Sequence, residues 1–400
     1  NAPLRAVTFN DVVRTTTDAL SSLDIQNAGA VALGSVDTDG TGGIVIGSAT
    51  PVTQINVGGT LDSTDGDAAV TAGPITLNSL DINLTATLTI DADDDVADGN
   101  IIIGSSTGDP QVDATTAGVE GLNIRSGTGD LTIYADLGQG LVALGNVDVD
   151  SDSGTIELRG DIFTKNGNVD FSGVTGTIDV TSNDGGPPIF VINSDAGPQD
   201  GTAAGFISFA GATLNATGVD LDFRADGAGT DADGDVTLPA SISTAASVRV
   251  DGRQITAGNI VTTGGFIQLT ADVSGNDPGG ADIVFTGSLL DTTNGGATAA
   301  GALILQSGGN NDTMTIDNGG GTVTFRTDGT VDNNITINLL LDAVASESLT
   351  LNAGTGGNVD LNAALGSVGT LGLLTIDGNN VTLGAGIEAD GMRVHGETSI

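Results

Sequence analysis

The 400-residue sequence contains no cysteine and no tryptophan. Without cysteine, the protein has neither disulfide bridges nor thiolate metal sites to stabilise it. Aromatic residues make up only 3% of the chain, so a core would have to be thin and built from Val, Ile, Leu and Ala. No run of about 18 apolar residues occurs, and we therefore expect no segment that spans a membrane as a helix.

Basic residues are scarce as well. The chain has 10 Lys and Arg against 51 Asp and Glu, which gives a formal net charge of −41. This charge excludes nucleic acid as a natural partner, because phosphate binding needs clustered Lys and Arg. Anionic membrane surfaces are disfavoured for the same reason. The partners that it favours are cations.

The same scarcity argues against an enzyme. A β-helix enzyme that cleaves acidic polysaccharides needs a base near carboxylates, and an acidic surface would repel its substrate. The single lysine, Lys165, and the single histidine, His395, stand far apart in the sequence. Arg249 and Arg253 are the one close basic pair, which we interpret as counter-charges on an acidic surface. We predict no catalytic residues, and polysaccharide cleavage is the least favoured alternative.

Short stretches of strict alternation dominate the sequence. Between them lie clusters of Gly, Asp, Asn and Ser, and Gly alone accounts for 63 residues. Runs with a period of two that are bounded by turn formers predict β-strands. Clear apolar pairs are Leu131/Ile133, Val147/Val149, Ile156/Leu158, Val169/Phe171 and Ile178/Val180. The nearest approach to a helical pattern is Leu339–Leu349, which is too short to be stable without packing.

Two all-β architectures use such strands, namely tandem β-sandwiches and a β-solenoid. The strands are very short, and Ile133, Ile156 and Ile178 recur after 23 and 22 positions, which favours a solenoid with roughly 20–25 residues per coil. The hexapeptide pattern of left-handed solenoids is missing. We predict a right-handed parallel β-helix that runs continuously over residues 1–400, with loop excursions near 183–205 and 275–301. Tandem β-sandwiches remain the alternative.

The two ends of the chain resemble each other. The elements "VTFN", "SSLDI", "AVALG" and "DTDG" within residues 7–40 match "VDLN", "GLLTI", "NVTLG" and "EADG" within residues 359–391, with nearly equal gaps. Self-similarity of this kind is typical of repeat architectures. Neither end shows the atypical, polar repeat that normally caps a solenoid. Matching ends without caps indicate that the coils continue, either along a longer chain or by head-to-tail contact.

The segment Ser348–Gly391 resembles the repeats of very large bacterial surface proteins of the filamentous-haemagglutinin-like kind. The resemblance rests on the elements "LTLNAGTG", "VTFN" and "GLLTID" and is clearest near both ends of the chain. It implies a parallel β-helix, secretion to the bacterial cell surface, and a structural or adhesive role. The amino-terminal secretion domain of that family is not visible in the sequence.

These observations predict an extracellular structural protein that belongs to a cell-surface filament through end-to-end continuation of β-solenoid units. Its main partner would then be a further copy of itself, bound head to tail. The first alternative is an adhesin passenger whose loops bind cell-surface glycans or neighbouring cells. The ten Phe residues and Tyr134 are scattered along the chain, which does not favour one aromatic binding loop.

Three acidic clusters are candidate calcium sites, because carboxylates at alternate positions followed by Gly resemble calcium-binding loops. None of them completes an EF-hand, and each is also compatible with a solvated turn or with adaptation to high salt. Stacked strands bring like charges close together, and divalent cations would relieve their repulsion. The predicted ligands are Asp91, Asp93, Asp95, Asp98, Asp148, Asp150, Asp152, Asp231, Asp233 and Asp235.

Overall fold

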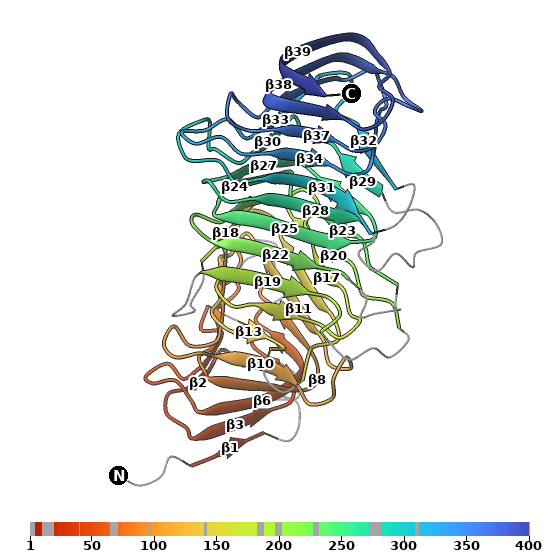
Figure 1. Cartoon of the computed structure of the whole chain (residues 1–400). Coiled ribbons are helices and arrows are strands. Elements are labelled where there is room, and N and C mark those ends of the chain that lie inside the picture. The colour runs from red at the N-terminus through yellow and green to blue at the C-terminus, as the bar shows by residue number, and fades with distance from the viewer. Residues whose placement is uncertain are drawn as a thin grey trace. The chain divides into compact units, whose positions relative to one another are not determined.

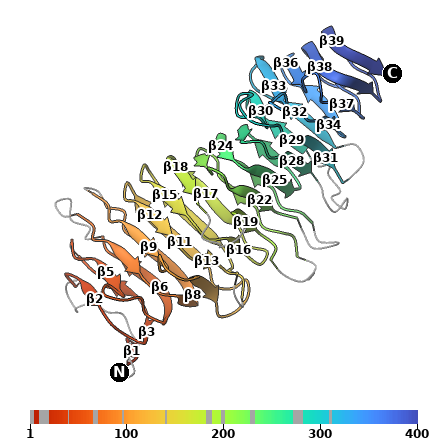
Figure 2. The same ribbon diagram turned by 60° about the vertical axis from the view of Figure 1, so that its left-hand side comes forward.

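The computed structural model describes residues 5–9, 20–39, 41–64, 71–94, 97–139, 142–181, 188–196, 202–226, 232–271, 282–308 and 312–399. The chain divides into two compact units. Unit 1 consists of Asn1–Gly197 with Phe209–Ala212, and unit 2 of Pro198–Ser208 with Thr213–Ile400. In each unit, short strands stack on one another coil by coil (Figures 1 and 2).

Each coil of unit 1 contributes strands to three faces, and equivalent strands of successive coils pair in parallel. The first face contains β2 (Leu23–Ile25), β5 (Ile44–Ile46), β7 (Ile75–Leu77), β9 (Ile101–Ile103), β12 (Leu131–Ile133), β15 (Ile156–Leu158) and β18 (Thr177–Val180). The second contains β1 (Val7–Thr8), β3 (Ala30–Leu33), the first halves of β6 (Gln54–Asp62) and β8 (Asp81–Asp91), β10 (Gln111–Ala114), β13 (Asp136–Leu137), β16 (Ile162–Phe163) and β19 (Ile189–Asn193). The third contains β4 (Val36–Asp37), the second halves of β6 and β8, β11 (Leu122–Gly127), β14 (Val147–Ser151) and β17 (Val169–Val174).

Unit 2 has the same three-faced construction. One face contains β21 (Thr213–Asn215), β24 (Ser241–Ala245), β27 (Asn259–Thr262), β30 (Leu289–Asp291), β33 (Thr322–Arg326), β36 (Ser348–Asn352) and the first halves of β38 (Leu371–Leu383) and β39 (Ala389–Ser399). The next contains β22 (Asp220–Arg224), β25 (Ser247–Gly252), β28 (Ile267–Ala271), β31 (Leu303–Ser307), β34 (Ile335–Ile337), β37 (Val359–Leu361) and the second halves of β38 and β39. The last contains β20 (Ile207–Ser208), β23 (Val236–Thr237), β26 (Ile255–Ala257), β29 (Asp282–Phe285), β32 (Thr313–Ile316) and β35 (Leu340–Ala343).

Parallel pairing of equivalent strands confirms the predicted all-β parallel β-helix. Tandem β-sandwiches are wrong, because their sheets are antiparallel. Leu339–Leu349 is not helical, since it forms β35 and the start of β36. The described residues contain no helix long and apolar enough to cross a membrane.

The core of each unit is a stack of aliphatic side chains. In unit 1, Leu131 pairs with Ile101 of the preceding coil and with Ile156 of the following one, and all three are fully buried. Burial of one such side chain stabilises the folded state by about 1.5–3 kcal/mol. The intervening residue of each strand points outward, as Thr132 does, and can therefore be polar. This alternation is the physical basis of the period-two pattern in the sequence.

The length of a coil varies more than the sequence predicted. Ile156 pairs with Ile178, 22 positions later, as expected. Ile133, however, pairs with Leu158 rather than with Ile156. In unit 2 the register partners are 18 positions apart for Ile242 and Ile260, and 36 positions apart for Leu269 and Leu305. The strands keep their register because they are buried, whereas the loops at the corners absorb insertions.

The similarity between the two ends of the sequence has a structural explanation in the strand register. In unit 1, Val7 of "VTFN" pairs directly with Val31 of "AVALG". In unit 2, Val359 of "VDLN" pairs with Val381 of "NVTLG" in the same way. At both ends, therefore, the first and third matching elements stack on each other one coil apart. The repeated sequence corresponds to a repeated register.

The two segments predicted as loop excursions contain strands in their described parts. Segment 183–205 includes β19, which pairs with β16. Segment 275–301 includes β29 and β30, which continue two faces of unit 2.

Candidate functional site

The third face of unit 1 carries two outward rows of polar side chains, set by the register of β8, β11, β14 and β17. One row runs from Thr89 through Asn123 and Asp148 to Asp170. The other row runs from Asp91 through Arg125 to Asp150. Equivalent residues of neighbouring strands lie about 5 Å apart, so each row forms a nearly continuous line of polar groups.

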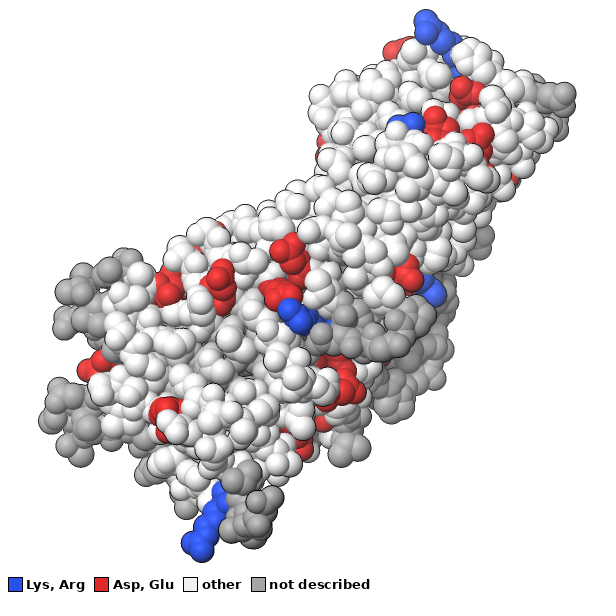
Figure 3. Space-filling model, turned by 90° about the vertical axis from the view of Figure 1, so that its left-hand side faces the viewer, with Lys and Arg blue, Asp and Glu red and all other residues white. Residues whose placement is uncertain are grey.

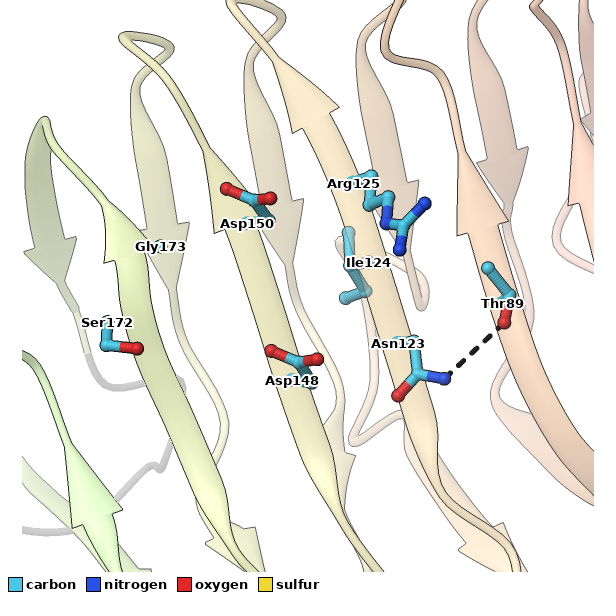
Figure 4. A pocket seen from close by; sticks show the side chains of 8 residues that line it. All are labelled: Thr89, Asn123, Ile124, Arg125, Asp148, Asp150, Ser172 and Gly173. Atoms are coloured by element: carbon cyan, nitrogen blue, oxygen red, sulfur yellow. Dashed lines mark hydrogen bonds between the residues drawn. The ribbon is translucent and has the colours of Figure 1, made fainter.

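A groove of about 300 Å³ lies over these rows (Figure 4). Its lining comes from four neighbouring strands and consists of Thr89, Asn123, Ile124, Arg125, Asp148, Asp150, Ser172 and Gly173. Except for Ile124, these side chains are polar or absent. The groove is therefore suited to a hydrogen-bonding ligand rather than to an apolar one.

A bulge in β17 shapes one side of the groove. Asp148 pairs with Asp170, but Asp150 pairs with Gly173, so β17 contains one extra residue opposite β14. The backbone N–H of Ser172 donates to the Asp170 carboxylate at 2.8 Å and holds the bulge in place. An added Cβ at Gly173 would lie 2.7 Å from Asp150 Oδ1, so a larger residue there would displace this carboxylate. Bulges commonly redirect side chains beside binding sites.

The positive charge in the groove is turned away from its carboxylates. Arg125 lies 3.7 Å from Asp91 of β8, and in Figure 4 its guanidinium points toward β8 rather than toward Asp150. Asn123 donates to Thr89 Oγ1 at 3.4 Å. Within the described part of the chain, neither the Asp148 nor the Asp150 carboxylate forms a hydrogen bond or an ion pair. Two acceptors of the groove thus remain available to a ligand.

Burial raises the pKa of Asp148, and the neighbouring charges of Asp170 and Asp150 raise it further. The Arg125 guanidinium opposes this shift without cancelling it. The repulsion follows from the register, since Asp148 and Asp170 face each other on adjacent strands. A ligand that donates hydrogen bonds to these carboxylates would lower this cost.

A second hollow of about 240 Å³ adjoins the groove and shares Asn123 with it. Its lining also comes from four successive coils and includes Thr87, Asn146 and Lys165. Part of its floor is bare backbone, because the coils approach so closely that only Gly fits. A Cβ on Gly167, for example, would lie 1.2 Å from the carbonyl oxygen of Gly145.

The acidic clusters predicted from the sequence as separate sites partly meet in space. The charges of Asp98, Asp91, Asp152 and Asp150 all add to the effect of burial in raising the pKa of Asp93. Two predicted clusters, one following β8 and one on β14, therefore lie at the same end of the third face. Asp98 differs, because hydrogen bonds from Thr128 and from the Asp94 N–H outweigh its burial and lower its pKa.

The predicted calcium ligands differ in burial and in their partners. Among the described residues, no three Asp, Glu or His side chains are placed to hold a metal ion. Asp148, Asp150 and Asp152 are exposed, Asp93 is exposed, and Asp91 and Asp98 are half-buried. Asp95 and Asp231 lie outside the described residues. Asp233 is buried, whereas Asp235 forms an ion pair with Arg253 at 2.8 Å.

The basic pair noted in the sequence serves as counter-charge, as predicted. Arg253 pairs with Asp235, and Arg249 pairs with Asp251 at 2.6 Å. The register places Arg249 opposite Asp222, and Arg224 opposite Asp251. Arg224 in turn forms an ion pair with Asp222 on its own strand. The four residues make a checkerboard on β22 and β25, in which each charge is adjacent to two of opposite sign.

His395 lies in a hollow of about 370 Å³ in unit 2, together with Asp377 and Thr355. It stands in register with Asp377 of the preceding coil. The side chain of His395 is exposed.

Sequence reasoning missed Asn123, Arg125 and Ser172 as groove residues, and Asp170 as the neighbour of Asp148. The element "GLNI", which contains Asn123, stands out in the sequence only as a repeat. Aligning "LNIR" with "VDVD" by their apolar positions would have placed Asn123 beside Asp148 and Arg125 beside Asp150. No such signal reveals the β17 bulge.

Figure 3 gives the wider electrostatic setting: on the face drawn, acidic side chains outnumber basic ones and lie in several separate groups. The chain matches no family model, no curated protein and no solved structure.

Proposed function

We propose that this chain is a structural segment of an extracellular filament, in which coils of the same register continue at the open edges of the solenoid. The observation that carries the proposal is the equivalent register at the two ends. Val7 stacks on Val31 in unit 1, and Val359 stacks on Val381 in unit 2. A fold that repeats its register can be extended without a new kind of interface.

The strand edges support this function. Within the described residues, β1 pairs only with β3, and β39 pairs only with β38. Among the described strands, the outer edge of each has no partner, and an edge of this kind readily accepts a further strand. The partner that fits best is another coil of the same type, either from a longer chain or from a second copy.

The inward positions of β39 continue the apolar columns of the core. Met392 and Val394 continue the columns of Leu374 and Ile376, which are fully buried in the preceding coil. Met392 is 42% exposed, and Val394 is half-buried. A further coil would remove this apolar surface from water, which stabilises the stacked state.

The location at a bacterial cell surface is part of the same proposal. The resemblance of Ser348–Gly391 to giant surface proteins supports it, as does the acidic surface, which keeps long assemblies soluble. We assign the chain no catalytic role, because its ion pairs account for the close arginine pair.

The experiment compares edge variants by sedimentation velocity over a range of protein concentrations. Replacing Met392 and Val394 with Lys places charges on the open end of the core, which is how natural sheet edges avoid pairing. We expect the unmodified protein to form larger species as its concentration rises, and the double variant to remain monomeric. Val331→Lys is the matched control, since Val331 is 64% exposed but lies away from β39.

Association that persists in the edge variant, or that Val331→Lys abolishes equally, would contradict extension at β39. A monomer at every concentration would contradict head-to-tail contact between copies.

A further inference from the structure

We propose that the groove over β8, β11, β14 and β17, together with the hollow that shares Asn123, binds a neutral oligosaccharide. This inference is independent of the end-to-end function, because the groove lies entirely within unit 1 and on one face of its coils. The ligand class follows from the combination of groups in the lining.

The groove needs a ligand that both donates and accepts hydrogen bonds. The Asp148 and Asp150 carboxylates are exposed and form no hydrogen bond within the described residues, so they can accept hydrogen bonds from a ligand. Arg125 contacts Asp91 and Asn123 donates to Thr89, and both keep further N–H groups that can donate to a ligand. A hydroxyl group supplies both functions, and a sugar carries several hydroxyls on one rigid ring.

The charges in the lining disfavour ionic ligands. A purely cationic ligand would pair with Asp148 and Asp150 but would lie beside Arg125 and, in the adjoining hollow, near Lys165. An anionic polysaccharide would meet the carboxylates at close range, where like charges repel strongly. A neutral polyol avoids both conflicts.

The dimensions fit a short linear chain of sugars. The groove and the hollow each extend over four successive coils, which corresponds to about 14 Å at the usual strand spacing. Their volumes, about 300 and 240 Å³, together reach the range of small-molecule sites. Asn123 and Asn146, from successive coils, each place an amide in the lining of the hollow.

Val119 adds a surface for the apolar face of a sugar ring. It lines the adjoining hollow and is 63% exposed, although the rest of that lining is polar or glycine. Sugar rings have one face of C–H groups, which an exposed aliphatic side chain can cover.

The test is isothermal titration calorimetry with cellotetraose, maltotetraose and mannotetraose. Tetragalacturonate, putrescine and calcium chloride are the ionic probes. We expect at least one neutral tetrasaccharide to bind with a Kd of about 1 mM or tighter. Asp150→Asn and Asn123→Ala should each weaken that binding by about tenfold, because each removes a hydrogen bond in the groove.

Asp360→Asn is the matched control, since it removes one carboxylate from β37 of unit 2. It should leave the Kd unchanged. Circular dichroism shows whether each variant is folded, and Asp150→Asn is chosen because it keeps the size of the side chain. The proposal is overturned if no neutral tetrasaccharide binds at 10 mM, about tenfold above the expected Kd. It is also overturned if the groove variants bind like the control, or if putrescine or calcium binds and no tetrasaccharide does.

Discussion

The charged side chains on the outward faces of the two units differ in whether their neighbours have the opposite or the same sign. In unit 2, Asp222, Arg224, Arg249 and Asp251 alternate in sign both along and across their strands. In unit 1, Asp148 faces Asp170, and the nearest guanidinium, that of Arg125, points toward Asp91. On the unit 2 surface each of these four charges lies beside charges of opposite sign, although one buried oxygen of Asp251 has no hydrogen-bond partner among the described residues. On the unit 1 surface, the Asp148 and Asp150 carboxylates form no hydrogen bond within the described residues. We interpret the first as structural and the second as available for binding.

The comparison shows that net charge is a poor guide to function in a solenoid. Both units are acidic, yet whether a carboxylate is neutralised depends on its neighbours along the same strand and on the next coil. A charge on an outward position meets the residue one coil away at about 5 Å. The register therefore converts a one-dimensional sequence into a two-dimensional pattern of charges.

The largest expected effect comes from breaking the checkerboard. Arg249→Ala leaves Asp251, whose side chain is only 1% exposed, without its ion pair, and should destabilise unit 2 by about 3 kcal/mol. Arg125→Ala is the counterpart in unit 1, where the guanidinium is 60% exposed, and should cost less than about 1 kcal/mol. Hydrogen exchange of the β25 and β11 amides reports each effect locally. Equal losses at both sites would remove the distinction between the two surfaces.

A smaller effect of opposite sign is expected in the groove. Asp148→Asn removes the repulsion with Asp170 and should stabilise β14 and β17 by about 0.5 kcal/mol. Asp222→Asn in the checkerboard should instead destabilise its strands, because it removes a partner of Arg224. The two variants are compared by local hydrogen exchange. A loss of stability in Asp148→Asn would mean that this carboxylate has a stabilising partner.

The stability of β14 should depend on pH through the protonation of Asp148. The pKa of Asp148 is raised above its ordinary value of 3.8 in the folded protein. Its protonation therefore favours the folded state, and the contribution is present below pH 3.8 and lost as the pH rises through the folded pKa. The stability that Asp148→Asn gains over the unmodified protein should therefore disappear as the pH falls from 7 to about 3, because Asp148 is then protonated in the unmodified protein. Hydrogen exchange of the β14 amides, corrected for its intrinsic pH dependence, measures the difference in local stability between the unmodified protein and Asp148→Asn. A difference in stability that stays constant between pH 7 and about 3 would contradict this prediction.

The smallest effect concerns salt. Added NaCl screens the repulsion between the like charges of unit 1 and should stabilise β14 and β17 by about 0.3 kcal/mol. The checkerboard of unit 2 should gain nothing, since salt weakens its attractive pairs. Hydrogen exchange at low and high ionic strength measures the change in local stability of each unit. A larger gain in stability in unit 2 would contradict the interpretation that the repulsive charges lie in unit 1.

The sequence was sufficient to predict the fold because the core depends on a local pattern. Alternation in "LTI" and "IEL" places Leu131 and Ile156 inward whatever the length of the loop between them. The site was harder to predict, because it depends on which outward residues become neighbours across coils of unequal length. A register error of two residues, as between Ile133 and Ile156, moves every outward pair along the strand. The β17 bulge, which places Gly173 beside Asp150, has no sequence signature of its own.

The end-to-end continuation of coils is tested most directly by cryo-electron microscopy of the purified protein. We predict filaments at high concentration, with an axial repeat of about 4.8 Å from strands stacked across the junctions. Filaments should be absent from the variant with Lys at Met392 and Val394. Isolated particles at every concentration, or filaments that the variant forms equally well, would contradict the account.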